Sequence, residues 1–138
     1  MAGMAGNVSW LRAIAGALAV EAGQIAALVV CVAIYGHLIA PGQAFEAYQA
    51  FANQSGPWVS IFVGSAIFYA AGRWIARSIP TAAVLFAFYV LIDGAILISE
   101  WENPTAREML LVAISVICNA TLCLFGGRHG QASRASAA

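Results

Sequence analysis

Charge is scarce in this chain, and lysine is absent altogether. Only 9% of the 138 residues are charged, 62% are hydrophobic, and all six basic residues are arginine. Soluble domains carry about 25% charged residues, so the composition excludes an ordinary soluble domain and predicts a membrane protein. The formal net charge of zero gives no reason to expect a nucleic-acid partner. Arginine without lysine, together with abundant alanine, is typical of GC-rich bacterial genes, so we expect a bacterial inner (plasma) membrane protein.

The motifs that usually carry catalysis or metal binding are also missing. The three cysteines, Cys31, Cys118 and Cys123, lie in apolar segments, and their odd number argues against a disulfide framework. His37 and His129 are expected on opposite sides of the membrane, which excludes a bis-histidine haem site within one chain. No zinc-protease, redox, nucleophile-elbow or phosphate-loop motif occurs. The sequence therefore predicts no cofactor and no metal site, and it argues against an enzyme.

Long hydrophobic runs are what the chain does have, and they predict four membrane spans. An apolar run of about 20 residues suffices to cross a hydrocarbon core of about 30 Å. The spans are expected at about 10–40, 58–77, 81–100 and 105–125. Short connections favour antiparallel neighbours, so the expected fold is an all-α, up-down four-helix bundle. The expected organisation is a flexible N-terminus (1–9), one transmembrane domain (10–127) and a flexible cytoplasmic tail (128–138).

Local signals predict where the helices begin and end. Asn7 or Ser9 can cap the first helix, and Pro41-Gly42 stops it. Residues 43–54 are too short and polar to span, which favours a short interfacial helix that ends at residues 55–57. Thr105 and Glu108 have the spacing of a capping box at the start of the fourth span. Gly126-Gly127 is expected to end that span.

The arginines indicate an orientation. Cytoplasmic flanks of membrane spans carry an excess of arginine and lysine. In a four-span arrangement only Arg107 falls on one side. The other side holds Arg12, Arg73, Arg77, Arg128 and Arg134. Both termini are therefore expected in the cytoplasm.

Polar side chains recur at helical spacing inside the apolar spans. A carboxylate in hydrocarbon costs roughly 2.5–3.5 kcal/mol on insertion scales, so it faces protein or water rather than lipid. The residues considered as candidates for a transport path or polar layer are Glu21, Gln24, Tyr69, Arg73, Asp93 and Asn119.

The depths of these residues suggest two polar layers. Position within each span places Glu21 near Arg73 in an inner layer, and Asp93 about 10 Å further out. Glu21 and Arg73 are therefore expected to form a charge pair, and Asp93 a hydrogen bond to Tyr35 or Ser65. Such contacts serve either a proton, cation or substrate path or simply the cohesion of the bundle, and the sequence leaves both open.

Four short spans with a glutamate in the first resemble the small multidrug resistance transporters. The resemblance implies that Glu21 takes the role of the glutamate that exchanges protons for cationic drugs in that family. Only Glu21 matches, by role rather than by surrounding motif. The chain departs from the family in the later position of Glu21, the long connection 41–57 and the additional Asp93.

The leading hypothesis is a small transport or channel-type protein that uses Glu21 and Asp93. The alternatives are a non-catalytic accessory subunit of a membrane complex, and a lipid- or quinone-binding subunit with Tyr69, Trp74 and Tyr89 at its pocket. A ridge of small residues on the first span permits close helix contact: Gly16, Ala19, Gly23 and Ala27. The expected partners are the lipid bilayer and either further copies of the chain or a membrane complex.

Overall fold

The computed structural model describes residues 7–100 and 104–136, and these residues form an all-α bundle. The first helix comprises α1 (Trp10–Ile34) and a π-helical end, η1 (Tyr35–Ile39). The second comprises α2 (Phe45–Val59), η2 (Ser60–Gly64), α3 (Ser65–Ala70) and η3 (Ala71–Ala76). The third and fourth are α4 (Ile79–Glu100) and α5 (Ala106–Ala135). All four are long and apolar enough to cross a membrane, which confirms the predicted four-helix membrane fold.

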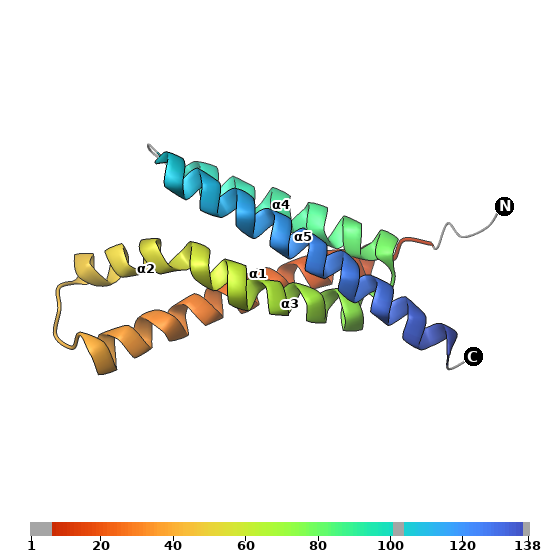
Figure 1. Cartoon of the computed structure of the whole chain (residues 1–138), viewed down its shortest axis with the longest axis horizontal. Helices are drawn as coiled ribbons and strands as arrows, with labels where there is room; N and C mark the ends of the chain where they lie inside the picture. The colour runs from red at the N-terminus through yellow and green to blue at the C-terminus, as the bar shows by residue number, and fades with distance from the viewer. Residues whose placement is uncertain (1–6, 101–103, 137–138) are drawn as a thin grey trace.

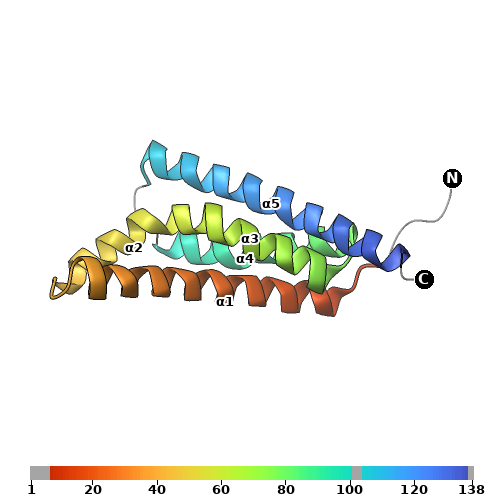
Figure 2. The ribbon, with the colours of Figure 1, turned by 60° about the horizontal axis from the view of Figure 1, so that its bottom comes forward.

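The helices pair as two antiparallel hairpins, α1 with α2–η3 and α4 with α5 (Figures 1 and 2). The starts of α1 and α4 lie side by side, because the Ser9 backbone N–H donates a hydrogen bond to Thr81 Oγ1 at 3.2 Å. Near the termini the hairpins pack closely, whereas α1 and α5 diverge toward the other end (Figures 1 and 2). The bundle is thus tight at one end and open at the other.

The tight end combines large buried side chains with glycines at the helix contacts. Large core residues there are fully buried, among them Val20, Phe68 and Leu85. A Cβ atom on Gly72 would collide with the backbone oxygen of Cys123, and one on Gly126 with that of Tyr69. These glycines let η3 and α5 approach backbone to backbone, where dispersion contacts are strongest.

Close packing also explains why the expected stop at Gly126-Gly127 is wrong. Both glycines lie inside α5, which continues to Ala135, so residues 128–135 are helical rather than a flexible tail. Glycine ends a helix when it adopts a positive φ, but φ is positive at neither of these positions. Here glycine provides room for a neighbouring helix instead. The predicted capping box of Thr105 and Glu108 is confirmed.

The expected break at residues 55–57 is also wrong. Residues 45–54 are helical as predicted, but they form the first turns of the long second helix, and Pro57 lies inside it. Proline removes one backbone N–H from the helix ladder. The carbonyl that loses its helical donor is that of Asn53, four residues earlier, and the π-helical stretch η2 follows Pro57. The helix therefore absorbs the proline by local adjustment rather than by ending.

The connection between the first two helices is closed by aromatic side chains. The Tyr48 hydroxyl donates to the Ala40 carbonyl and accepts the Gln43 N–H, both at 3.0 Å. Tyr35 and Phe51 stack with ring centroids 3.9 Å apart. As expected, the first helix ends just before Pro41-Gly42. Ser9 occupies the N-cap position without a side-chain cap. The predictions for residues 1–6, 101–103 and 137–138 lie outside the described residues.

Candidate functional site

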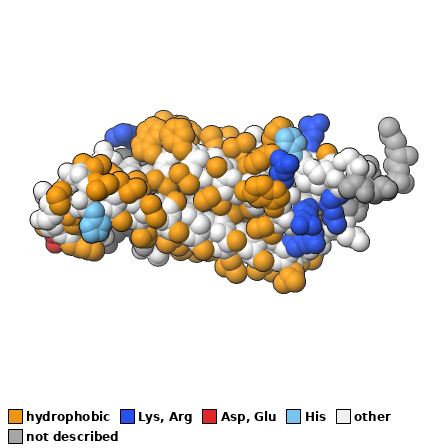
Figure 3. Space-filling model, turned by 90° about the horizontal axis from the view of Figure 1, so that it is seen from below, with side chains coloured by type: hydrophobic (Ala, Val, Ile, Leu, Met, Phe, Trp, Pro, Cys, Tyr) orange, Lys and Arg blue, Asp and Glu red, His pale blue; other side chains and the backbone are white. Residues whose placement is uncertain are grey.

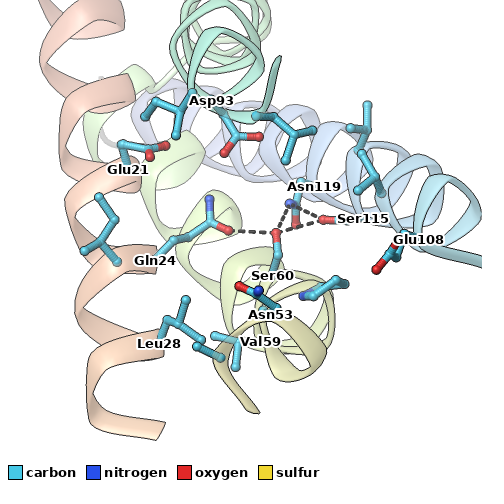
Figure 4. A pocket seen from close by; sticks show the side chains of 18 of the residues that line it. Glu21, Gln24, Leu28, Asn53, Val59, Ser60, Asp93, Glu108, Ser115 and Asn119 are labelled. Atoms are coloured by element: carbon cyan, nitrogen blue, oxygen red, sulfur yellow. Dashed lines mark hydrogen bonds between the residues drawn. The ribbon is translucent and has the colours of Figure 1, made fainter. Parts of the chain in front are cut away.

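A cavity of about 790 Å³ lies between the two hairpins, on the side where they diverge. Its volume is typical of cavities that hold small molecules, about 300–1,000 Å³. Side chains from α1, α2, η2, α4 and α5 line it, so it is assembled by the whole bundle rather than by one helix (Figure 4).

Three carboxylates line this cavity: Glu21 from α1, Asp93 from α4 and Glu108 from α5. Glu21 and Asp93 turn their side chains toward the same space (Figure 4). Glu108 is exposed, and its Oε2 also accepts the Thr105 N–H of the capping box at 2.8 Å. No arginine or histidine is among the described residues that line the cavity, so its walls are acidic.

The expectation of two separate polar layers is therefore wrong for Glu21 and Asp93. Ser9 and Thr81 are hydrogen-bonded at a common level. Glu21 and Asp93 each lie twelve residues beyond them, or about 18 Å at the helical rise. The two carboxylates lie at the same depth because their helices start at the same level and rise equally per residue. The sequence-based estimate instead used the fractional position within each predicted span, and the spans differ in length, so it separated the two residues.

A hydrogen-bonded network of five side chains holds the polar base of the cavity. Ser60 Oγ donates to Gln24 Oε1 at 2.7 Å and lies 2.8 Å from Ser115 Oγ (Figure 4). Asn119 Nδ2 donates to Ser60 Oγ at 3.3 Å and to Ser115 Oγ at 3.2 Å. Its Oδ1 accepts the Ser65 hydroxyl at 2.9 Å. Because Ser60 has one hydroxyl proton, which Gln24 receives, Ser115 must donate to Ser60.

Two buried polar atoms beside this network have no partner among the described residues: Glu21 Oε2 and Gln24 Nε2. One is an acceptor and the other a donor, and both side chains line the cavity. A buried polar group without a partner costs about 1–3 kcal/mol, so native structures rarely leave one without water or a ligand. Both side chains line the cavity, so a molecule in it could donate a hydrogen bond to Glu21 Oε2 and accept one from Gln24 Nε2.

The remaining walls are largely apolar. They include Ile25 and Leu28 from α1, Ile96 and Leu97 from α4, and Val112 from α5. An apolar surface with a few converging polar groups is the usual composition of a small-molecule site.

Tyr69 and Arg73 do not belong to the cavity. Arg73 Nη1 donates to the Tyr69 hydroxyl at 3.1 Å, and this hydroxyl lies 2.9 Å from His129 Nδ1. No ion pair joins Glu21 to Arg73 in the described part of the chain, so the expected charge pair is wrong. The two side chains have different neighbours: Glu21 lines the cavity, whereas the Arg73 side chain contacts Tyr69 of α3.

The hydrogen bonds expected for Asp93 are absent as well. Ser65 donates to Asn119, and Tyr35 stacks on Phe51 near the loop between the first two helices. Of the six candidate residues, the structure brings Glu21, Gln24, Asp93 and Asn119 together. Sequence reasoning missed Ser60 as the centre of the network. Its spacing of seven residues from Asn53, which also lines the cavity, is the helical signal that could have found it.

The described side chains do not form a metal-binding cluster. Among the described residues, no three histidine, cysteine, aspartate or glutamate side chains lie close enough together to hold an ion.

Comparisons of this chain with protein-family models, with curated proteins and with solved structures find no match. The functional argument therefore rests on the cavity itself.

Proposed function

We propose that this chain is a small membrane transport protein that admits a cation to the cavity between its hairpins. The observation that carries the proposal is the charge of the lining: three carboxylates, with no basic side chain among the described lining residues. A charge in surroundings of low polarity interacts strongly with an opposite charge, so a cation compensates carboxylates that would otherwise be costly there.

The walls favour an organic cation with an apolar body over a bare metal ion. A cavity of about 790 Å³ is far larger than an ion needs, and aliphatic side chains cover much of it. In the proposed complex the cationic group lies between Glu21 and Asp93, and the apolar body contacts Ile25, Leu28 and Leu97. Gln24 Nε2 supplies a hydrogen-bond donor to an acceptor on the substrate or to a bound water.

We further propose a bacterial inner-membrane location with both termini in the cytoplasm. Five of the six arginines support this orientation. The cavity lies toward the opposite end of the bundle, so in this orientation it faces the outside. Closely packed glycines and buried core side chains separate it from the cytoplasmic end.

Transport can be tested in liposomes that contain the purified protein. Vesicles loaded with unlabelled tetraethylammonium are expected to accumulate labelled tetraethylammonium by counterflow. Glu21→Gln and Asp93→Asn should each reduce the initial rate at least tenfold, because each removes a charge from the cavity. Glu46→Gln is the matched control, since Glu46 is exposed on α2 and does not line the cavity.

Counterflow no faster than in protein-free vesicles would contradict transport of this probe. Equal loss of rate in Glu46→Gln would contradict a role for the cavity. A lipophilic molecule that remains bound after detergent exchange, in the absence of counterflow, would instead favour the lipid- or quinone-binding alternative.

A further inference from the structure

A second cavity, of about 390 Å³, lies at the opposite end of the bundle, beside the starts of α1 and α4. Its polar lining contains three arginines together with hydroxyl and amide side chains, and none of the described residues that line it is a carboxylate. These polar residues are Asn7, Ser9, Arg12, Arg77, Ser78, Thr81, Gln131 and Arg134. The cavity is therefore as strongly basic as the first is acidic.

The three arginines come from three separate parts of the chain. Arg12 lies in the first turn of α1, Arg77 follows η3, and Arg134 lies in the last turn of α5. Like charges repel, so a structure that gathers three guanidinium groups around one space is more stable when an anion occupies it. Arginine is also the side chain best suited to phosphate, because its planar fork can donate two parallel hydrogen bonds.

Arg77 is held in an unusual backbone conformation at this cavity. Its φ of 58° is positive, and no other non-glycine residue in the described part of the chain has a positive φ. The left-handed conformation is unfavourable for residues that carry a Cβ atom, and glycine is the usual choice there. Arg77 Nε donates to the Trp74 carbonyl at 2.8 Å, which fixes the guanidinium and leaves its other N–H groups available.

Helix ends of both signs meet at this cavity: α1 and α4 begin beside it, and η3 and α5 end beside it. The partial charges of the helix dipoles therefore largely offset one another, and the arginines supply the net positive charge, while the first-turn N–H groups of α1 and α4 can still act as donors. Ser9, the N-cap of α1, makes no side-chain cap. Phosphate and other anions bind readily in this position.

Tryptophans place the cavity near the membrane surface. Trp10 lies between the lining residues Ser9 and Arg12, and Trp74 lies two residues before Ala76, which also lines the cavity. The two tryptophan side chains are 61% and 64% exposed. Tryptophan gathers at the level of lipid head groups. Figure 3 shows most of the visible arginine side chains gathered near one end of the molecule, next to wide hydrophobic areas. Basic pockets between helices at this level are known to hold anionic lipid head groups.

We propose that this cavity binds a phosphate group, with Arg12, Arg77 and Arg134 as the charged ligands. The group belongs either to an anionic phospholipid or to a soluble phosphate, since both present the same oxygens to the arginines. This site is independent of the proposed cation transport, because the two cavities share no lining residue.

The proposal can be tested on the full chain in nanodiscs. Inorganic phosphate is titrated by calorimetry into protein in phosphatidylcholine nanodiscs. In a second arm, native mass spectrometry measures retention of phosphatidylglycerol relative to phosphatidylcholine. Saturable phosphate binding indicates a soluble ligand. Selective retention of phosphatidylglycerol without phosphate binding indicates a lipid head group, and either result supports the site.

Single substitutions distinguish binding in the cavity from a general effect of positive charge at this end of the bundle. Arg12→Gln and Arg134→Gln should each weaken binding about tenfold, because each removes charge-assisted hydrogen bonds. Arg128→Gln is the matched control: Arg128 is exposed at the same end but does not line the cavity. Arg77→Gly should lose binding while keeping or raising the thermal stability, since glycine suits the positive φ. Absence of binding in both arms, or an equal loss in Arg128→Gln, would overturn the proposal.

Discussion

Glu21 and Asn119 illustrate two ways in which a polar side chain is accommodated inside this bundle. Asn119 is 1% exposed, and its amide makes hydrogen bonds to Ser60, Ser65 and Ser115, so its polar atoms are satisfied by protein. Glu21 Oε2 is buried and has no hydrogen-bond partner among the residues that the structure describes. A satisfied amide stabilises the fold, whereas an unsatisfied carboxylate is retained at a cost in stability. This contrast favours a structural role for Asn119 and a functional one for Glu21.

The separation of Glu21 from Arg73 gives a prediction for a double-mutant cycle. Because Arg73 contacts Tyr69 and no ion pair joins it to Glu21, we expect additive effects of Glu21→Ala and Arg73→Ala, within about 0.3–0.5 kcal/mol. Unfolding of the four proteins in detergent measures the cycle. A coupling of several kcal/mol would show that the two charges do form a pair and would contradict the described geometry.

For individual residues, the sequence predicted polar side chains that gather at one place, four of its six candidates, better than it predicted their contacts. Helical spacing identified Glu21, Gln24, Asp93 and Asn119, because a 3.6-residue period places polar side chains on the inward faces. It could not assign partners, since these depend on the register between helices. That register is fixed by contacts such as Ser9 to Thr81, which no local pattern reveals.

Among the helices, α5 shows how glycine can be misread from sequence alone. Gly126-Gly127 has the composition of a helix stop, yet α5 runs through it, and the two glycines leave room for neighbouring segments that would collide with a Cβ atom. Pro57 was misread in the same way in the second helix. Long apolar runs predicted all four helices, but their ends were less predictable wherever tertiary packing overrides the local preference of glycine or proline.

Substitution of Gly126 tests this packing. A Cβ there would collide with the Tyr69 carbonyl and lie 3.0 Å from the Arg73 nitrogen, both of them backbone atoms that cannot move aside easily. Gly126→Ala should therefore destabilise the bundle by about 1–3 kcal/mol, as overpacking does elsewhere.

Gly94→Ala in α4 is the control for that substitution, because nothing lies within 4 Å of its Cβ position. Alanine there should be neutral or stabilise by about 0.5–1 kcal/mol. Thermal unfolding in detergent compares the two variants. Equal melting temperatures for Gly126→Ala and the unmodified protein would mean that η3 and α5 are not in close contact.

The whole molecule separates its charges along the bundle axis. The tight end carries the basic cavity of Arg12, Arg77 and Arg134, and the diverging side carries the acidic cavity of Glu21 and Asp93. Long apolar runs predicted the four spans, but the divergence of the hairpins depends on how the helices cross. The expectation that the chain self-associates or joins a larger membrane complex stays a prediction.

The central claim is that the acidic cavity binds cations through Glu21 and Asp93. It is tested most directly by calorimetric titration of benzyltrimethylammonium into the purified protein, with benzenesulfonate as the anionic control. Protons compete for the same carboxylates, so affinity should fall as the pH is lowered. We expect saturable binding of the cation alone, weakened at least tenfold in Glu21→Gln and Asp93→Asn and unchanged in Glu46→Gln. Equal affinity for the cation and the anion, or cation binding that survives loss of both carboxylates, would contradict the account.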